Sequence, residues 1–390
     1  MKQILPKLKQ IEKHLCFAKK AFTKNGFRHM TQYIDGLIAL NKKTVKQISR
    51  ASLEENHHSA ISRLLTDASV KQKELECRYL SKLEYIMRRQ KKILVFDDTL
   101  AEHNGKKIEE TQRHFDHSND EFITGHQFFT ALIYTPLLQL PLFPQLYSKN
   151  TDSKIRMAND LINRLQEVIH IDTVLFDSWY SDKDLIKKCR TKGMRVICPI
   201  KTNRVISLVK GEWTPLKEFA NTIQGTALDN YFIDDKEYKI GSYTPKLSGV
   251  APVKMLISHE WDSKDKDWLA PFFLISTRTK DTPVEIIRTY RIRWHIETYH
   301  WDIKQHLGFA KSFVRKTQGI VRHAILVALA YAVLRLFMFS RGLNMTVGEC
   351  IEHIQDTEMD GFIREIVEIE DRQERINYFE EVFIRETAKV

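Results

Sequence analysis

Residues 289–309 read TYRIRWHIETYHWDIKQHLGF, and the rest of the chain is best interpreted from this segment outward. Four of its residues share one narrow stripe of a helix, because at about 100° of turn per residue they project within about 60° of one another. They are Tyr290, Arg293, Glu297 and Lys304. In such a stripe the carboxylate suits a metal cation, whereas the basic groups suit phosphate oxygens. The alternative is an exposed helix with i, i+4 ion pairs, which is common on a basic protein.

The start of this helix is marked by a capping sequence. Thr282 is a suitable N-cap, Pro283 suits the first helical position, and Glu285 completes a capping box. The pattern therefore predicts a helix that begins at Pro283 and carries the whole stripe.

Two upstream segments end in acidic residues. Residues 91–99 read KKILVFDDT and residues 171–181 read IDTVLFDSWYS, so in each a short apolar run leads directly to an aspartate. Such a run predicts a strand with the carboxylate at its carboxyl edge, where open α/β sheets bind ligands. Taken singly, each aspartate is equally typical of a turn or a helix cap.

The order of two strand-end aspartates followed by the Tyr-Arg-Glu-Lys spacing resembles bacterial insertion-sequence DDE transposases of the "insertion sequence four" superfamily. The resemblance implies that Asp97, Asp177 and Glu297 are the catalytic, metal-binding acids. Asp177 matches the Asp-Ser-aromatic-Tyr pattern of the family. For the first acid Asp97 fits Asp-any-Thr, and Asp98 remains the alternative.

The chemistry implied by the resemblance is phosphoryl transfer with two divalent ions, Mg²⁺ or Mn²⁺, which activate the nucleophile and stabilise the leaving oxygen. Arg293, Lys304 and Tyr290 would contact phosphates near the cut. Trp268, with Trp261 as the alternative, would stack on a DNA base; a buried tryptophan in a β-domain is the other interpretation.

Charge is distributed unevenly along the chain. The net charge is +11, and residues 1–90 contain 19 Lys and Arg against 8 Asp and Glu. This excess predicts a polyanionic partner, which the resemblance implies is double-stranded DNA. Lys46 and Arg50 lie in a helix-turn-helix-like segment and are candidate DNA contacts, together with Lys42 and Lys43. A basic helical bundle with a solvated face is the alternative. Residues 349–390 are acidic, with 13 acidic against 5 basic residues.

Several function classes are not indicated. The longest apolar stretch, Ala324 to Leu334, has eleven residues and suits a buried helix, so no membrane partner is expected. No phosphate-binding G-x-x-x-x-G-K-[ST] sequence occurs, so no nucleotide cofactor is expected. The five cysteines are scattered, and the N-terminus lacks a signal-peptide pattern. These features predict a cytoplasmic protein, and the resemblance implies a bacterial one that associates with the nucleoid when it binds DNA.

The predicted fold class is α/β: a ribonuclease H-like catalytic core interrupted by a β-rich insertion, with an α-helical N-terminal DNA-binding region and a helical C-terminus. The order of elements supports the resemblance. Strands are predicted at 92–97, 121–129, 131–138, 173–177, 195–200 and 272–278, and helices at 153–169, 182–192 and 320–338. The predicted domains are 1–90 (DNA binding), 91–202 and 269–340 (core), 203–268 (insertion) and 341–390 (acidic, possible dimerisation).

The best interpretation is a transposase that binds the terminal inverted repeats of an insertion sequence, cleaves there and joins the ends to target DNA, as a homodimer in the synaptic complex. One alternative is a ribonuclease H-like metal-dependent nuclease without strand transfer. The other is a non-catalytic DNA-binding protein derived from a transposase, although all three acids are present.

Overall fold

The computed structural model describes residues 8–377, except 53–56, 104, 106, 117–119, 151–152, 224–227 and 312–313. The chain forms two compact units, each assembled from segments distant in sequence. The first contains residues 1–82, 100–126 and 300–390, and the second contains residues 83–99 and 127–299. The division into five predicted segments stays a prediction, and the two ends of the chain, 1–7 and 378–390, lie outside the described residues.

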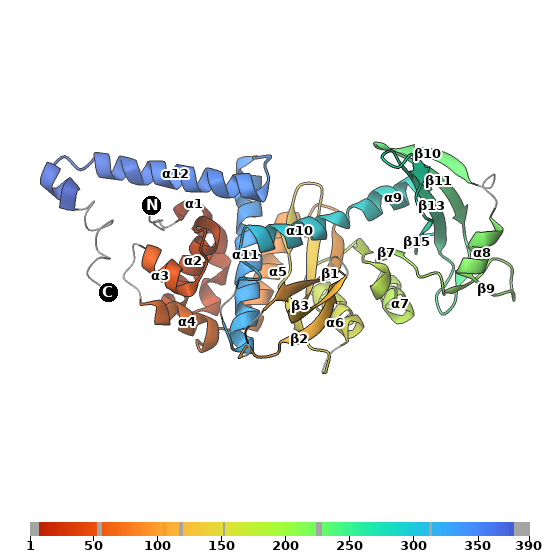
Figure 1. The fold of residues 1–390 in the computed structure, drawn as a ribbon, viewed down its shortest axis with the longest axis horizontal. Helices are drawn as coiled ribbons and strands as arrows, with labels where there is room; N and C mark the ends of the chain where they lie inside the picture. The colour runs from red at the N-terminus through yellow and green to blue at the C-terminus, as the bar shows by residue number, and fades with distance from the viewer. Residues whose placement is uncertain are drawn as a thin grey trace. The chain divides into compact units, whose positions relative to one another are not determined.

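The second unit is built on a mixed sheet with strand order β10-β11-β13-β15-β7-β6-β1-β3 (Figure 1). Its centre is parallel: residues 93–95 of β1 pair with 173–175 of β6, which pair with 195–197 of β7. Each of the three strands has fully buried apolar side chains (residues 94–96, 174–175 and 196–198), which explains their continuous apolar sequences. The core strands are β1 (Ile93–Glu102), β3 (Glu121–Tyr134), β4 (Gln139–Pro141), β5 (Gln145–Tyr147), β6 (Thr173–Leu175), β7 (Arg195–Pro199) and β15 (Phe272–Ser276).

The helices of this unit follow the predicted order closely. The predicted helices at 153–169 and 182–192 are confirmed as α6 and α7. The full set is α6 (Lys154–Gln166), η2 (Ser178–Tyr180), α7 (Lys183–Thr191), α8 (Leu216–Thr222), α9 (Pro283–Arg291) and the start of α10 (Trp294–Gln305).

Two strand predictions were wrong. The segments 121–129 and 131–138 form one long strand, β3, as far as Tyr134. The first strand does not end at Asp97, since β1 continues to Glu102. The reason is that β1 has β3 as a neighbour on its other side. Only the parallel pairing with β6 stops at Val95, two residues before Asp97.

The segment predicted as a β-rich insertion extends the same sheet. β13 (Lys254–Asp262) pairs with β15, and β11 (Lys236–Tyr243) and β10 (Asp229–Ile233) follow outward. β14 (Asp267–Trp268) pairs with the end of β13. A separate small sheet contains β8 (Val205–Ser207), β9 (Thr214–Pro215) and β12 (Lys246–Leu247).

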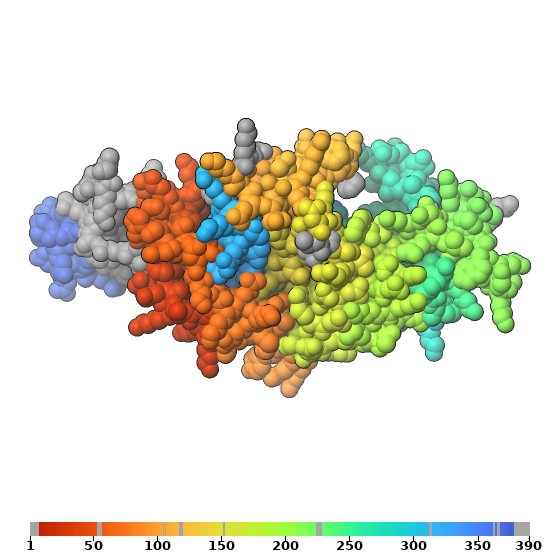
Figure 2. All heavy atoms as spheres, turned by 90° about the horizontal axis from the view of Figure 1, so that it is seen from below, coloured from red at the N-terminus to blue at the C-terminus, as the bar shows by residue number. Residues whose placement is uncertain are grey.

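The first unit is mainly helical and is centred on α11 (Thr317–Arg341), which contacts α2 and α4. Arg322 donates to the backbone carbonyls of Leu64 and Ala68, and His323 Nδ1 lies 2.8 Å from the Tyr33 hydroxyl. The predicted helix at 320–338 is thus confirmed as part of α11, which packs among the N-terminal helices. On the face shown in Figure 2, α11 (light blue) reaches the surface over a small area.

Among the described residues α11 is also the one helix long and apolar enough to cross a membrane, but 89% of its most apolar window is buried within the protein. The other elements of this unit are α1 (Lys9–Glu12), η1 (Lys13–Ala21), α2 (Lys24–Ala39), α3 (Val45–Ala51), α4 (His58–Thr66), most of α5 (Gln72–Met87), β2 (Gln112–Asp116) and α12 (Val347–Val367).

Candidate active site

Asp97 lies in the middle of the second unit, just past the parallel part of β1. Its carboxylate accepts a hydrogen bond from the Asp98 amide (2.8 Å to Oδ1) and one from Arg293 (Nη1 to Oδ2, 3.0 Å). Its side chain is 16% exposed. Burial first, and then the charges of Asp177 and Asp98, raise the pKa of the Asp97 carboxyl to about 7, although Arg293 opposes the shift. A bound cation would therefore add to the compensation that Arg293 gives to the negative charge of these carboxylates.

Asp98 is already bound by protein donors. Its Oδ2 accepts from Lys154 Nζ (2.8 Å) and from the Gln127 amide, and its Oδ1 accepts from the Tyr180 hydroxyl (3.0 Å). Three donors thus bind its two oxygens. Asp97, which has a single side-chain donor among the described contacts, is the better placed of the two neighbours to coordinate a metal.

Asp177 follows β6 and begins the short helix η2. Its Oδ1 accepts hydrogen bonds from the amides of Trp179 (2.9 Å) and Tyr180 (3.3 Å). Burial raises the pKa of the Asp177 carboxyl, and these two amide bonds oppose the rise. Asp177 therefore caps η2, as the helix-cap interpretation held. Both bonds use Oδ1, so capping is compatible with metal coordination by the same carboxylate.

The helix that carries the Tyr-Arg-Glu part of the stripe is interrupted, contrary to the prediction of one continuous helix. α9 ends at Arg291 and α10 begins at Trp294. Between them the Arg293 amide donates to Tyr290 O (2.9 Å) and the Ile296 amide donates to Arg293 O (3.1 Å). These are i to i−3 bonds, which tighten the backbone locally into a 3₁₀-like turn.

Arg293 nevertheless reaches both neighbouring acids. Its Nη1 lies 3.0 Å from Asp97 Oδ2 and 3.1 Å from Glu297 Oε1, so one guanidinium nitrogen joins β1 to α10. Its guanidinium carbon is 6.0 Å from the centre of the Tyr290 ring. Lys304 follows seven residues after Glu297 on α10, within the first unit, and is not among the residues described at this site.

A pocket of about 700 Å³ opens beside these groups. Asp177, Tyr290 and Arg293 line it on one side, and Phe272 lines it from β15. The segment 199–203, which follows directly from β7, completes the wall. The pocket is large enough for a nucleotide-sized group and combines aromatic surface with both signs of charge.

Sequence reasoning missed several residues of this site. Lys201, Thr202 and Asn203 were not singled out, although they follow a core strand at its carboxyl end, the same signal that identified Asp177. Lys154 and Gln127 were missed because their contact with Asp98 spans 56 and 29 residues of sequence.

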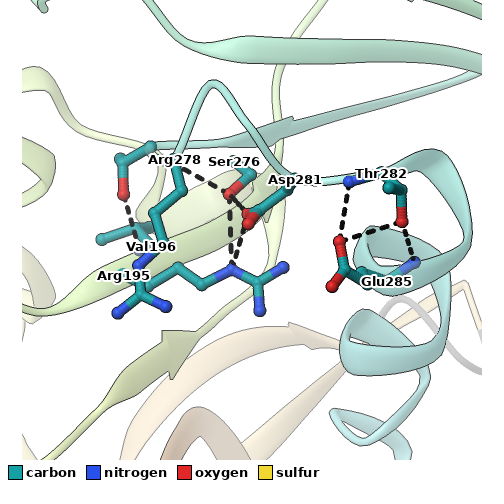
Figure 3. Close-up of polar contacts among 8 residues, drawn as sticks. Arg195, Val196, Ser276, Arg278, Asp281, Thr282 and Glu285 are labelled. Carbon is teal, nitrogen blue, oxygen red and sulfur yellow. Dashed lines mark hydrogen bonds and ion pairs between the residues drawn. The ribbon is translucent and has the colours of Figure 1, made fainter.

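The start of α9 is fixed by polar contacts shown in Figure 3. The predicted capping box is confirmed, because Thr282 Oγ1 accepts from the Glu285 amide and the Glu285 carboxylate accepts from the Thr282 amide. Just before it, Arg195 Nε of β7 donates to Asp281 Oδ2 (2.7 Å), which also accepts from Ser276 of β15. The helix that carries Tyr290 is thereby tied to two core strands.

The candidate DNA contacts outside the pocket lie on other elements. Trp268 forms a cross-strand pair with Trp261 (ring centres 5.2 Å apart) and carries Lys239 Nζ 4.5 Å above its ring. It does not line the pocket, and its stacking role stays a prediction. Lys46 and Arg50 are exposed on α3, and their role also stays a prediction.

Lys43 was wrongly grouped with the exposed lysines. Its Nζ donates to Leu37 O (2.6 Å) and Leu40 O at the end of α2, and burial lowers the pKa of this amine to about 8. Lys43 therefore stabilises the end of a helix.

The candidate metal ligands are the carboxylates of Asp97, Asp177 and Glu297. Among the described residues, no group of three or more His, Cys, Asp or Glu side chains is arranged to hold a metal ion. The donors nevertheless have the right chemistry for Mg²⁺, and a cation, the Arg293 guanidinium, already lies between Asp97 and Glu297. The chemistry of these donors fits a divalent ion, but among the described residues the three carboxylates do not form one ligand set.

Comparison with known proteins identifies the family of the chain. Residues 88–333, more than half of the chain, match the family described as the transposase DDE domain, and residues 16–135 match the DDE superfamily endonuclease family. No curated protein matches the chain. Among solved structures, a piggyBac transposase synaptic complex with hairpin DNA is similar, at 10% identity and a TM-score of 0.47, over 97% of this chain and 81% of that one. The chain belongs to the transposase DDE domain family and is an enzyme of the transposase type.

Proposed function

We propose that this protein is the transposase of a bacterial insertion sequence, of the "insertion sequence four" superfamily, with a ribonuclease H-like core. It would bind the terminal inverted repeats, cleave DNA at the element ends and join them to target DNA. The observation that carries the proposal is the junction at Arg293, which contacts Asp97 and Glu297 and lines one pocket with Asp177.

Asp97, Asp177 and Glu297 would hold two Mg²⁺ or Mn²⁺ ions. When bound, these ions lower the pKa of a nucleophilic oxygen and neutralise the leaving oxygen. Asp97 supports this role because it is buried beside two other carboxylates, an arrangement that disfavours its charge until a cation arrives. Asp177 is oriented by the two η2 amides, so its carboxylate is held before any ligand binds.

Arg293 would exchange its carboxylate partners for a phosphate when the acids take up metal. Its guanidinium presents five donors, so it can keep one contact with Glu297 and still bind a phosphate oxygen. Tyr290 is half-buried, its ring centre lies 5.9 Å from that of the exposed Phe272, and it would contribute its hydroxyl to the same DNA strand. Lys201 and Asn203, which also line the pocket, would contact the DNA backbone.

The remaining DNA contacts are assigned to other parts of the chain. Lys46 and Arg50, exposed on α3, would bind phosphates of the terminal repeat. Lys304 would contact phosphate near the cut and Trp268 a base. A homodimer would bring the two ends together, and the protein would act in the bacterial cytoplasm on nucleoid DNA.

The test is metal-dependent cleavage of a labelled duplex that carries the sequence flanking the gene. Wild type should cut at the repeat boundary with Mg²⁺ or Mn²⁺, and Glu297→Gln should not. Strand-transfer products would distinguish a transposase from a nuclease. Cutting without preference for the boundary would favour the nuclease, and tight binding without cutting would favour a DNA-binding relic.

A matched control exists for Asp177. Asp182 caps α7 through Oδ1 bonds to the amides of Asp184 (2.9 Å) and Leu185 (3.1 Å), much as Asp177 caps η2. Asp177→Asn should abolish cleavage and leave DNA affinity within a few fold, whereas Asp182→Asn should cleave normally. If both variants lose cleavage equally, capping and not metal binding explains the effect.

A further inference from the structure

A buried polar network behind the two aspartates has no role in the function proposed so far. Its centre is Asp98, whose oxygens are bound by Lys154, Gln127 and Tyr180. These donors come from α6, β3 and η2, so one carboxylate links three elements to β1. The side chains of Asp98 and Lys154 are only 19% and 11% exposed.

Tyr180 connects this network to the second candidate metal ligand. Its amide donates to Asp177 Oδ1 (3.3 Å), and its hydroxyl donates to Asp98 Oδ1 (3.0 Å). Its ring is fully buried and lies 5.1 Å from the ring of Phe96, the residue before Asp97. Tyr180 thus links Asp98, the neighbour of Asp97, to Asp177 through its hydroxyl and its backbone amide.

Lys154 contributes the positive charge of the network. Its Nζ lies 2.8 Å from Asp98 Oδ2, and it also lies above the rings of Trp179 (4.8 Å) and Tyr147 (5.3 Å). These aromatic contacts restrain η2 and the segment before α6 around a single ammonium group. Asp98 is therefore neutralised within the protein and does not need a metal ion.

We propose that Asp98, Tyr180 and Lys154 form a positioning network that fixes the separation of Asp97 and Asp177 and so prepares the pair to bind divalent metal. Asp98 acts through its neighbours and is not itself a ligand. This inference rests on the function proposed above, because it assigns the network to the same metal site.

The expected effect follows from the behaviour of groups that orient metal ligands, whose loss typically lowers metal affinity or activity by about 10- to 100-fold. Tyr180→Phe removes the hydroxyl and keeps the buried ring. In the full chain it should weaken Mn²⁺ binding, measured by the EPR signal of free Mn²⁺ without DNA, by about 10-fold or more. The Mn²⁺ concentration for half-maximal cleavage should rise in parallel, and excess Mn²⁺ should restore much of the rate.

Tyr238→Phe is the matched control. The Tyr238 hydroxyl donates to Glu260 Oε2 (2.9 Å) at a buried position in the same unit, so this variant makes the same chemical change away from the site. It should leave Mn²⁺ binding unchanged. Equal Mn²⁺ affinity in wild type and Tyr180→Phe would overturn the network, and equal loss in both tyrosine variants would overturn it as well.

Asp98→Asn separates positioning from direct coordination, because asparagine can still accept from Tyr180. It should retain measurable cleavage that improves with added Mn²⁺, whereas Asp97→Asn should not recover. Abolished cleavage in Asp98→Asn without rescue, in a folded protein, would make Asp98 a ligand and refute the proposal. If the proposed function is wrong, wild type itself will neither bind Mn²⁺ nor cleave DNA, and this result would overturn the positioning network as well.

Discussion

Replacing Asp97 by Asn should stabilise the metal-free protein while abolishing cleavage. The pKa of the buried Asp97 carboxyl is raised from its usual 3.8 to about 7. The folded state therefore holds this proton more tightly than the unfolded chain does. Stability is lost as pH rises from about 4 through 7, because the carboxylate must then be charged in a site that disfavours the charge.

The magnitude follows from the pKa difference of about 3, which corresponds to about 4 kcal/mol at ~1.4 kcal/mol per pKa unit. Relaxation around the charge reduces this figure, so we expect Asp97→Asn to be more stable by about 1–3 kcal/mol at pH 8. For a unit of this size each kcal/mol raises the Tm by about 2–4 °C. The gain should shrink between pH 7 and pH 4 and vanish below pH 4.

The assay is thermal unfolding from pH 4 to 8, first in EDTA and then with Mg²⁺. Mg²⁺ should stabilise wild type more than the variant, because only wild type retains the ligand. The exposed Asp160 provides a control, since Asp160→Asn should change neither the Tm nor its pH dependence. A variant less stable than wild type at pH 8, or a difference that does not depend on pH, would refute the reasoning.

Three further outcomes are expected. Asp281→Asn breaks the buried pair with Arg195 and should destabilise the protein by about 3–5 kcal/mol in denaturant unfolding; an effect below 1 kcal/mol would mean that α9 is anchored otherwise. Lys43→Met should lower the Tm because two helix-end carbonyls lose their donor, and an unchanged Tm would place this lysine among the solvated ones. Lys46→Ala should weaken binding of all DNA sequences alike and reduce the slope of log K against log salt by about 1, whereas an unchanged slope would exclude α3 as a phosphate contact.

Local signals in the sequence predicted the parts of the site that depend on local structure. The capping box at Thr282 and Glu285 forms as predicted because it involves residues three apart. Asp177 follows a buried strand as predicted, because a short apolar run (residues 174–176) bounded by polar residues is typical of a central parallel strand.

The rest depends on contacts that periodicity does not encode. The break between α9 and α10 contains neither Pro nor Gly, so nothing in the local sequence marks it. The continuation of β1 past Asp97 depends on its second neighbour, β3, and the partners of Asp98 come from distant segments. Lys43 is a further example. The sequence does not distinguish it from the exposed Lys42 and Lys46, yet its amine donates to carbonyls at the end of α2.

Because β13 pairs with β15, the segment 203–268 cannot be deleted or exchanged as an independent module. Deleting the segment would remove the outer neighbour of β15. Five residues of β15 would then have unpaired backbone donors and acceptors, and such an exposed strand edge promotes aggregation. β15 also supplies Phe272 to the pocket wall. Experiments that graft another segment here should therefore leave residues 254–276 intact, so that the register of β13 with β15 is kept.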